Sequence, residues 1–204
     1  MGLRNNNAMK LCLARKILAV IVLVPIVFLV MLNLHEIGHT IFARLFGDED
    51  AGYYLYRTLG ENQTCVGCNF YDTAKLSTIG NLVVVIGGLL FSQTVLWLLF
   101  HARHRVKWAK QYGYLLVTAM IVFASDLPFQ VAQGLRMNIG NQSGLTNVDL
   151  ADFLYLLHTE YEVPVGHGKL GLLVFALSYC LLVYASIRAR PEVVDPVEQS
   201  RELR

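Results

Sequence analysis

The sequence predicts an all-α integral membrane protein with about four transmembrane helices. Of its 204 residues, 55% are hydrophobic and only 16% are charged, whereas soluble domains carry about a quarter charged residues. The hydrophobic residues are gathered into long runs, and a helix that spans a bilayer needs about 20 of them in succession. The runs that reach this length lie at 17–46, 76–100, 112–131 and 170–187.

The length suits one helical domain without a separate soluble module. We expect residues 1–190 to form a single transmembrane domain and the polar tail, 191–204, to be disordered. The net charge of +2 is too small to indicate nucleic-acid binding, and the lipid bilayer is the expected surrounding. The oligomeric state stays open.

Lysine and arginine alternate between the two sides of the predicted bundle. They concentrate before the first run, between the second and third runs, and after the fourth run. The positive-inside rule then predicts a multi-pass protein with both termini in the cytoplasm. The segments 47–75 and 132–169 face outward in this arrangement.

The two outward segments carry their own structural signals. Residues 51–58 are aromatic and β-prone, which predicts a small hairpin, and we expect the segment 51–60 to hold substrate as an added strand. Residues 147–158 repeat apolar residues at helical spacing, which predicts a helix on the outer membrane surface before the last span. Cys65 and Cys68 are expected to form a local disulfide, because a structural zinc site usually needs four ligands.

His35, Glu36 and His39 form the pattern His-Glu-x-x-His near the end of the first run. On a helix, residues four apart lie one turn above each other, so both imidazoles face the same point. This arrangement suits a tetrahedral Zn²⁺ ion, and Glu36, offset by one residue, can serve as general base. Ionisable groups on an apolar helix are costly without a partner, and a divalent metal supplies one. The pattern therefore predicts a zinc site with Glu36 as its catalytic residue.

A catalytic zinc ion usually has a third protein ligand, and Asp126 is the predicted one because it is the only acidic residue inside the other three runs. Counting about 1.5 Å per residue from the cytoplasmic ends places His35 at about 28 Å and Asp126 at about 22 Å, both in the outer half of the bilayer. Pro128 is expected to break the helix just after Asp126 and turn the carboxylate inward. The alternative third ligands are Asp149, Asp152 and His158.

Residues 35–39 (HEIGH), which continue as TIFARLFG, resemble the zinc helix of the site-2 protease family of intramembrane zinc metallopeptidases. Members of that family carry His-Glu-x-x-His on one core helix and an aspartate ligand two helices later, and they cleave the transmembrane segment of a partner protein. Asp126 matches that aspartate by position, although Leu127 follows it where the family has glycine. The resemblance covers roughly residues 17–135.

Residues 86–93 (IGGLLFSQ) resemble the family's small-residue stretch with a polar residue beyond it. The resemblance implies a substrate-binding role for Asn81, Gly87 and Gly88. Close approach of two helices at the glycine pair and a helix–helix hydrogen bond from Asn81 are the alternatives.

These observations together predict an intramembrane zinc metalloprotease that hydrolyses peptide bonds of membrane-protein substrates. Glu36 would take a proton from the attacking water and deliver it to the leaving amine. The alternative is a zinc-binding membrane protein without proteolytic activity, a regulator or chaperone, which would not need the Glu36 carboxylate. A metal transporter is disfavoured because the second and fourth runs are nearly free of ionisable groups.

Overall fold

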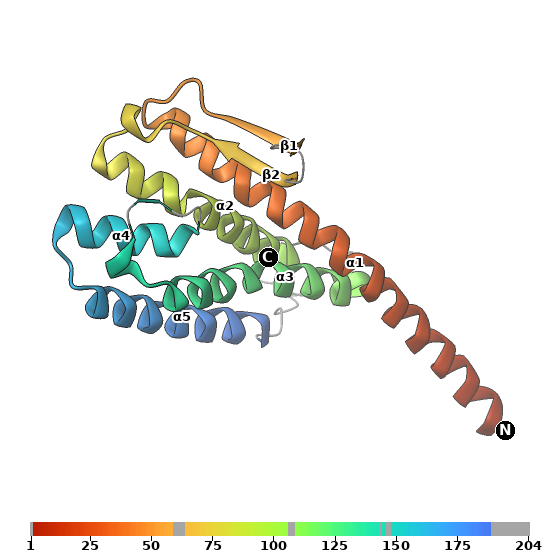
Figure 1. The fold of residues 1–204 in the computed structure, drawn as a ribbon. Coiled ribbons are helices and arrows are strands. Elements are labelled where there is room, and N and C mark those ends of the chain that lie inside the picture. The colour runs from red at the N-terminus through yellow and green to blue at the C-terminus, as the bar shows by residue number, and fades with distance from the viewer. Residues whose placement is uncertain (1, 59–63, 106–108, 143, 146–147, 189–204) are drawn as a thin grey trace, which may run out of the picture.

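The computed structural model describes residues 2–58, 64–105, 109–142, 144–145 and 148–188, and the side chains of 13–58, 67–103, 112–142, 144–145 and 148–188. Within this part, the chain forms long helices and one small hairpin at the edge of the bundle (Figure 1). The elements are α1 (Gly2–Leu45), β1 (Gly52–Thr58), β2 (Thr64–Phe70), η1 (Thr73–Lys75), α2 (Thr78–Arg105), α3 (Ala109–Arg136), η2 (Ile139–Asn141), α4 (Asp149–Tyr161) and α5 (Val165–Arg188). The predicted polar tail, 191–204, lies outside the described residues.

Four of the helices are long and apolar enough to cross a membrane. Their spans are Leu13–Leu45, Thr78–Arg103, Tyr112–Arg136 and Val165–Arg188. Each overlaps one of the apolar runs, and the all-α membrane fold is therefore confirmed. The side of the membrane on which the termini lie stays a prediction.

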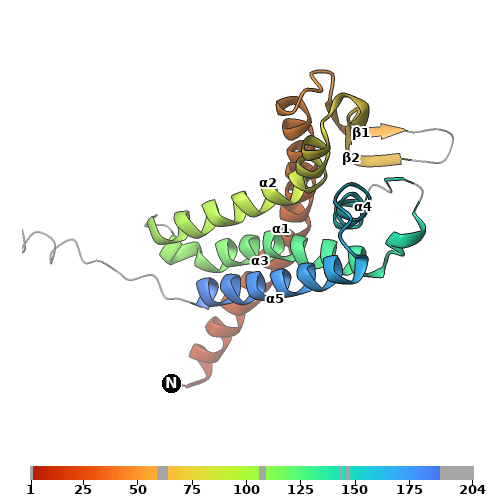
Figure 2. The ribbon, with the colours of Figure 1, turned by 90° about the vertical axis from the view of Figure 1, so that its left-hand side faces the viewer.

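The N-terminal half of α1 projects past the other helices (Figures 1 and 2). Among its described side chains, from residue 13 onward, most of the apolar ones are exposed, for example Ile17 and Ile21. The C-terminal half packs against α2 and α3, and there the exposed side chains give way to buried ones such as Met31. The part of α1 that carries His35 and His39 is therefore the part enclosed by the bundle.

The crossing of α1 and α2 is close because both helices carry glycine there. A Cβ atom on Gly38 would lie 2.6 Å from the carbonyl oxygen of Gly87, and a Cβ on Gly87 would lie 2.7 Å from the ring of Phe42. Real side chains do not tolerate such distances, so only glycine allows this approach. The close helix approach that the glycine pair permits is present in the structure.

The predicted hairpin is confirmed: β1 and β2 pair in antiparallel register, with Gly52 opposite Phe70 and Tyr54 opposite Cys68. The hairpin lies along the C-terminal half of α1 (Figure 1). Cys68 is disulfide-bonded, while the side chain of Cys65 lies outside the described side chains. The predicted pairing of these two cysteines therefore stays a prediction.

Short helix α4 confirms the helix predicted within residues 147–158. It packs against α2, α3 and α5 and lies on the same side of the bundle as the hairpin (Figure 2). Its buried face carries Leu150 and Leu154, which join the apolar core. A Cβ on Gly134 of α3 would lie 3.1–3.3 Å from the backbone and Cβ atoms of Leu150 and Ala151. Glycine at this position of α3 therefore lets the first turn of α4 approach closely.

The expected break at Pro128 is wrong. Helix α3 continues through this proline, and its one non-helical residue in the described part is Tyr112, near the other end. A proline inside a helix removes one backbone N–H, so the carbonyl of Ala124 loses its usual partner. Packing holds the turn in place nonetheless, because Leu127 and Val131 are buried in the core.

Candidate metal centre

Two imidazoles from consecutive turns of α1 form the base of the site. The side chains of His35 and His39 are both buried, with 4% of each residue exposed. Their ring centroids lie 5.0 Å apart, as expected for residues four apart on one helix face. The prediction that both rings face one point is therefore consistent with the structure.

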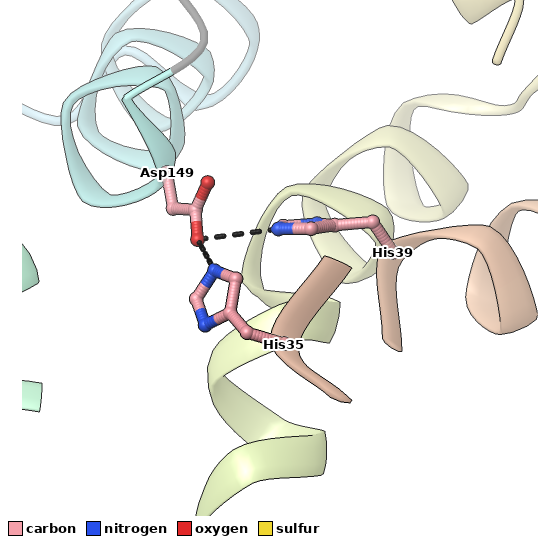
Figure 3. A group of neighbouring side chains, drawn as sticks. All are labelled: His35, His39 and Asp149. Atoms are coloured by element: carbon pink, nitrogen blue, oxygen red, sulfur yellow. Dashed lines mark hydrogen bonds and ion pairs between the residues drawn. The ribbon is translucent and has the colours of Figure 1, made fainter. Parts of the chain in front are cut away.

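The third member of the group is Asp149, the first residue of α4. Its Oδ2 atom lies 2.7 Å from Nε2 of His35 and 3.3 Å from Nε2 of His39 (Figure 3). In the described part of the chain, these three residues form a group that could hold a metal ion, with their ligand atoms within 4.8 Å of one another. Segments 114 residues apart in the sequence therefore meet at this point.

The other nitrogen of the His39 ring is held by the backbone of α2. Nδ1 of His39 lies 2.7 Å from the carbonyl oxygen of Val84. A carbonyl oxygen only accepts, so Nδ1 carries the proton and Nε2 of the neutral ring presents a lone pair. This lone pair points toward Asp149 (Figure 3).

A carboxylate from α3 orients the His35 ring in the same way, through its Nδ1 atom. Nδ1 of His35 lies 2.9 Å from Oδ2 of Asp126. The same oxygen accepts a hydrogen bond from the hydroxyl of Ser92 on α2. An ionised carboxylate accepts from Nδ1–H, so in the neutral ring Nε2 of His35 presents its lone pair toward Asp149.

Three electron-pair donors therefore converge: the two Nε2 atoms and Oδ2 of Asp149. Such atoms repel one another at 2.7 and 3.3 Å unless a cation, either a metal ion or protons on the rings, lies between them. Ligands about 2.0–2.2 Å from a tetrahedral zinc ion are about 3.3–3.6 Å apart. The 3.3 Å from Asp149 to His39 matches this spacing and the 2.7 Å to His35 is shorter, while two imidazoles and a carboxylate are a donor set that suits zinc.

Asp126, the predicted third ligand, occupies a different place. It contacts Nδ1 of His35, on the opposite side of the ring from the Nε2 atom that faces Asp149. The structure therefore places Asp149 with the two histidines and Asp126 behind one of them, where such a partner orients a ligand. Asp126 thus contacts His35, as its depth along α3 led us to expect, and its role as a ligand stays a prediction.

The remaining alternatives lie apart from the group. Asp152 is buried one turn beyond Asp149 and faces the adjacent cavity. His158 is exposed, and its Nδ1 lies 3.1 Å from the carbonyl oxygen of Val163 near the end of α4. Asp149 and Asp152 both lie in the first turn of α4, where an acidic residue is favourable, so the sequence did not distinguish them.

Glu36 is oriented by the hairpin. Its Oε2 accepts a hydrogen bond from the side-chain amide of Asn69 on β2. A Cβ on Gly67, whose φ of +68° favours glycine, would lie 3.2 Å from Cγ of Glu36. The hairpin therefore packs directly on the predicted general base, and sequence reasoning missed Asn69.

A cavity of about 390 Å³ opens beside the metal centre. Glu36 and His39 line it from α1, Asp149 from α4, and Asn69 and Tyr71 from the hairpin and the segment after it. The predicted general base and two members of the candidate metal group thus share one space that is large enough for a short stretch of peptide.

Two groups outside the membrane spans have shifted pKa values. Burial would raise the pKa of Asp149, but His35 and His39, which hydrogen-bond and attract the carboxylate when protonated, outweigh burial and lower it. Burial, together with the negative charges of Asp149, Asp152 and Glu36, raises the pKa of Tyr71 to about 12. At neutral pH, Asp149 is therefore an ionised carboxylate and Tyr71 a neutral hydroxyl donor.

Gly88 lies against the candidate metal centre itself. A Cβ at this position would lie 2.5 Å from Nε2 of both His35 and His39. Asn81 lies elsewhere, where its side-chain amide donates to the carbonyl oxygen of Thr73. The assignment of Asn81, Gly87 and Gly88 as substrate-binding residues stays a prediction.

Comparisons with protein-family models, curated proteins and solved structures found no match for this chain.

Proposed function

We propose that this chain is an intramembrane zinc metalloprotease, similar to the site-2 proteases, that hydrolyses peptide bonds of membrane-protein substrates. The observation that carries the proposal is the convergence of the lone pairs of His35, His39 and Asp149 beside Glu36, in one cavity within a bundle of apolar helices. His35, His39 and Asp149 would hold the zinc ion, and Asp126 would orient the ring of His35. A zinc ion supplies Lewis-acid activation of water and of a peptide carbonyl.

Glu36 acts as the general base in this proposal. It follows His35 directly in the chain, so its carboxylate lies beside the metal group and reaches the cavity. The hydrogen bond from Asn69 holds one carboxylate oxygen and leaves the other to accept a proton from water. The same carboxyl group then delivers the proton to the leaving amine.

The hydroxyl of Tyr71 is the neutral donor in the cavity. Because its pKa is raised to about 12, it remains protonated over the physiological range. It can therefore donate a hydrogen bond to a substrate carbonyl oxygen without competing with Glu36 for the proton.

The hairpin lies where an extended substrate would pass Glu36. Tyr54 of β1 and Phe70 of β2 line the same cavity as Glu36. An extended segment of a membrane protein that pairs with the hairpin edge would bring its backbone toward the metal centre. Most of the segment 51–60 belongs to β1, while residues 59 and 60 lie outside the described residues.

A comparison of two variants tests the proposal against the alternative of a zinc-binding protein that does not cleave. Glu36→Gln keeps the size of the side chain but removes the base, so we expect hydrolysis of a membrane-protein substrate to fall about 10²–10⁴-fold with zinc still bound. His39→Ala is expected to abolish both zinc binding and hydrolysis. Both are measured on protein purified in detergent, by elemental analysis and by cleavage assay. If Glu36→Gln retains the full function of the wild type, the protease proposal fails.

A further inference from the structure

A line of side-chain hydrogen bonds connects the last helix with the interior of the bundle. Nε1–H of Trp97 donates to the hydroxyl of Tyr179 over 2.9 Å, and that hydroxyl donates to Oε1 of Gln93 over 3.0 Å. Trp97 and Gln93 lie on α2 and Tyr179 on α5. The line therefore joins two helices that carry no ligand of the candidate metal centre.

The side-chain amide of Gln93 has one orientation that satisfies its neighbours. Its Nε2 lies 3.1 Å from the carbonyl oxygen of Phe123, which only accepts, so Nε2 faces this oxygen and Oε1 faces Tyr179. The same Nε2 lies 3.4 Å from Oγ of Ser92, which accepts from it. The carbonyl oxygen of Phe123 and the hydroxyl of Tyr179 thus together hold the amide with Nε2 toward Ser92.

The line ends on the carboxylate behind His35. The hydroxyl of Ser92 accepts from Gln93 and has two acceptors of its own, the carbonyl oxygen of Leu89 at 3.0 Å and Oδ2 of Asp126. Oδ2 of Asp126 is the closer of the two, and it also receives Nδ1–H of His35. Every donor in the line meets an acceptor, from Trp97 to Asp126. Ser92 is fully buried and Asp126 is nearly so, so water does not replace a lost member.

We propose that Tyr179 and Gln93 are positioning residues of the metal centre: through Ser92 they hold Asp126 against Nδ1 of His35, and so keep Nε2 of His35 aimed at the metal. This inference rests on the proposed function, because it assigns a role toward the same zinc ion. It makes the zinc affinity depend on the hydroxyl of a residue on α5, which contributes no ligand.

The test measures the zinc dissociation constant of the full chain in detergent by competition with a chelator, together with the unfolding temperature. Loss of a group that orients a ligand weakens metal binding about 10- to 100-fold, so we expect about 10-fold weaker binding for Ser92→Ala and about threefold for Tyr179→Phe. The double variant Ser92→Ala/Tyr179→Phe should bind zinc no more weakly than Ser92→Ala, because without the Ser92 hydroxyl Tyr179 and Gln93 are no longer connected to Asp126.

Two matched controls separate positioning from general packing. Ser125→Ala removes a hydroxyl beside Asp126 that donates only to the carbonyl oxygen of Val122, and Tyr184→Phe removes an exposed hydroxyl from α5. Both are expected to leave the zinc affinity unchanged.

Three outcomes overturn the inference. The first is that Tyr179→Phe binds zinc as tightly as Tyr184→Phe. The second is that the factors by which Tyr179→Phe and Ser92→Ala weaken zinc binding multiply in the double variant. The third is a wild type that binds no zinc, which would overturn the proposed function and this inference together. If the wild type binds zinc and Tyr179→Phe binds it equally tightly, only this inference fails and the proposed function stands.

Discussion

At the scale of single residues, the candidate metal centre depends on which nitrogen of each imidazole carries the proton. The carbonyl oxygen of Val84 and the carboxylate of Asp126 take Nδ1–H of His39 and His35, respectively, and both Nε2 lone pairs are left to face Asp149. Val84 and Asp126 therefore do two things: they satisfy the buried Nδ1 atoms, and they favour the tautomer that can bind a metal. The surroundings of His35 and His39, as well as their spacing, therefore suit the candidate metal centre.

The pair of histidines and Glu36 could be predicted from the sequence because their arrangement depends only on the pitch of one helix. The part of Asp149 could not, because its position depends on how α4 packs against α2 and α3. Among the acidic residues, burial in an apolar run favoured Asp126, and this criterion detects a buried carboxylate whether it binds a metal or a histidine. Nothing in the sequence indicated that Asn69 belongs to the site, since only the folded hairpin brings it to Glu36.

Gly88 provides a prediction at this scale. In Gly88→Ala, the added methyl group would lie 2.5 Å from both Nε2 atoms and would displace them or occupy the space between them. We expect zinc affinity to fall on the order of 100-fold and stability to fall by about 1–3 kcal/mol. Chelator competition and thermal unfolding measure the two effects.

The control for this variant is Gly171→Ala on α5, where an added Cβ meets nothing within 4 Å. Alanine allows the unfolded chain fewer conformations than glycine does, so this variant is expected to be more stable than the wild type by about 0.4–1 kcal/mol and to bind zinc normally. Equal zinc affinity in Gly88→Ala and Gly171→Ala would contradict the placement of the metal beside Gly88.

At the scale of the elements, α4 is the helix that completes the site. The four long helices and α4 itself could be predicted from apolar runs and helical spacing, because both signals are local. The position of α4 could not be, since it depends on the close approach to Gly134 of α3 and on the contact of Leu150 with the core. The predicted break at Pro128 was wrong because packing around α3 holds a turn that local preference disfavours.

Gly134 therefore offers a prediction about α4. Leucine at this position has no space beside Leu150 and Ala151, so Gly134→Leu should push the first turn of α4 away from α3 and carry Asp149 with it. We expect zinc affinity to fall about 10-fold or more, with a loss of stability of about 1–3 kcal/mol. Gly140→Leu is the matched control, because a Cβ on Gly140 meets nothing within 4 Å. If the two variants bind zinc equally well, α4 does not depend on Gly134 for its position.

At the scale of the whole molecule, the fold brings three separate parts of the chain to one place. The enclosed half of α1 supplies two histidines and the glutamate, the hairpin supplies the partner of the glutamate, and the start of α4 supplies the aspartate (Figures 1 and 3). The bundle shields this group among apolar helices, while a cavity keeps Glu36 accessible. This combination of a buried candidate metal group and an accessible carboxylate is what a hydrolytic site within a membrane requires.

The zinc content of the purified protein tests the central claim most directly. Our account predicts about one zinc ion per chain for the wild type, less than about a tenth of that for Asp149→Ala, and a weakened but retained site for Asp126→Ala. The contradictory result would be a wild type without zinc, or an Asp149→Ala variant that retains as much zinc as the wild type while Asp126→Ala loses it.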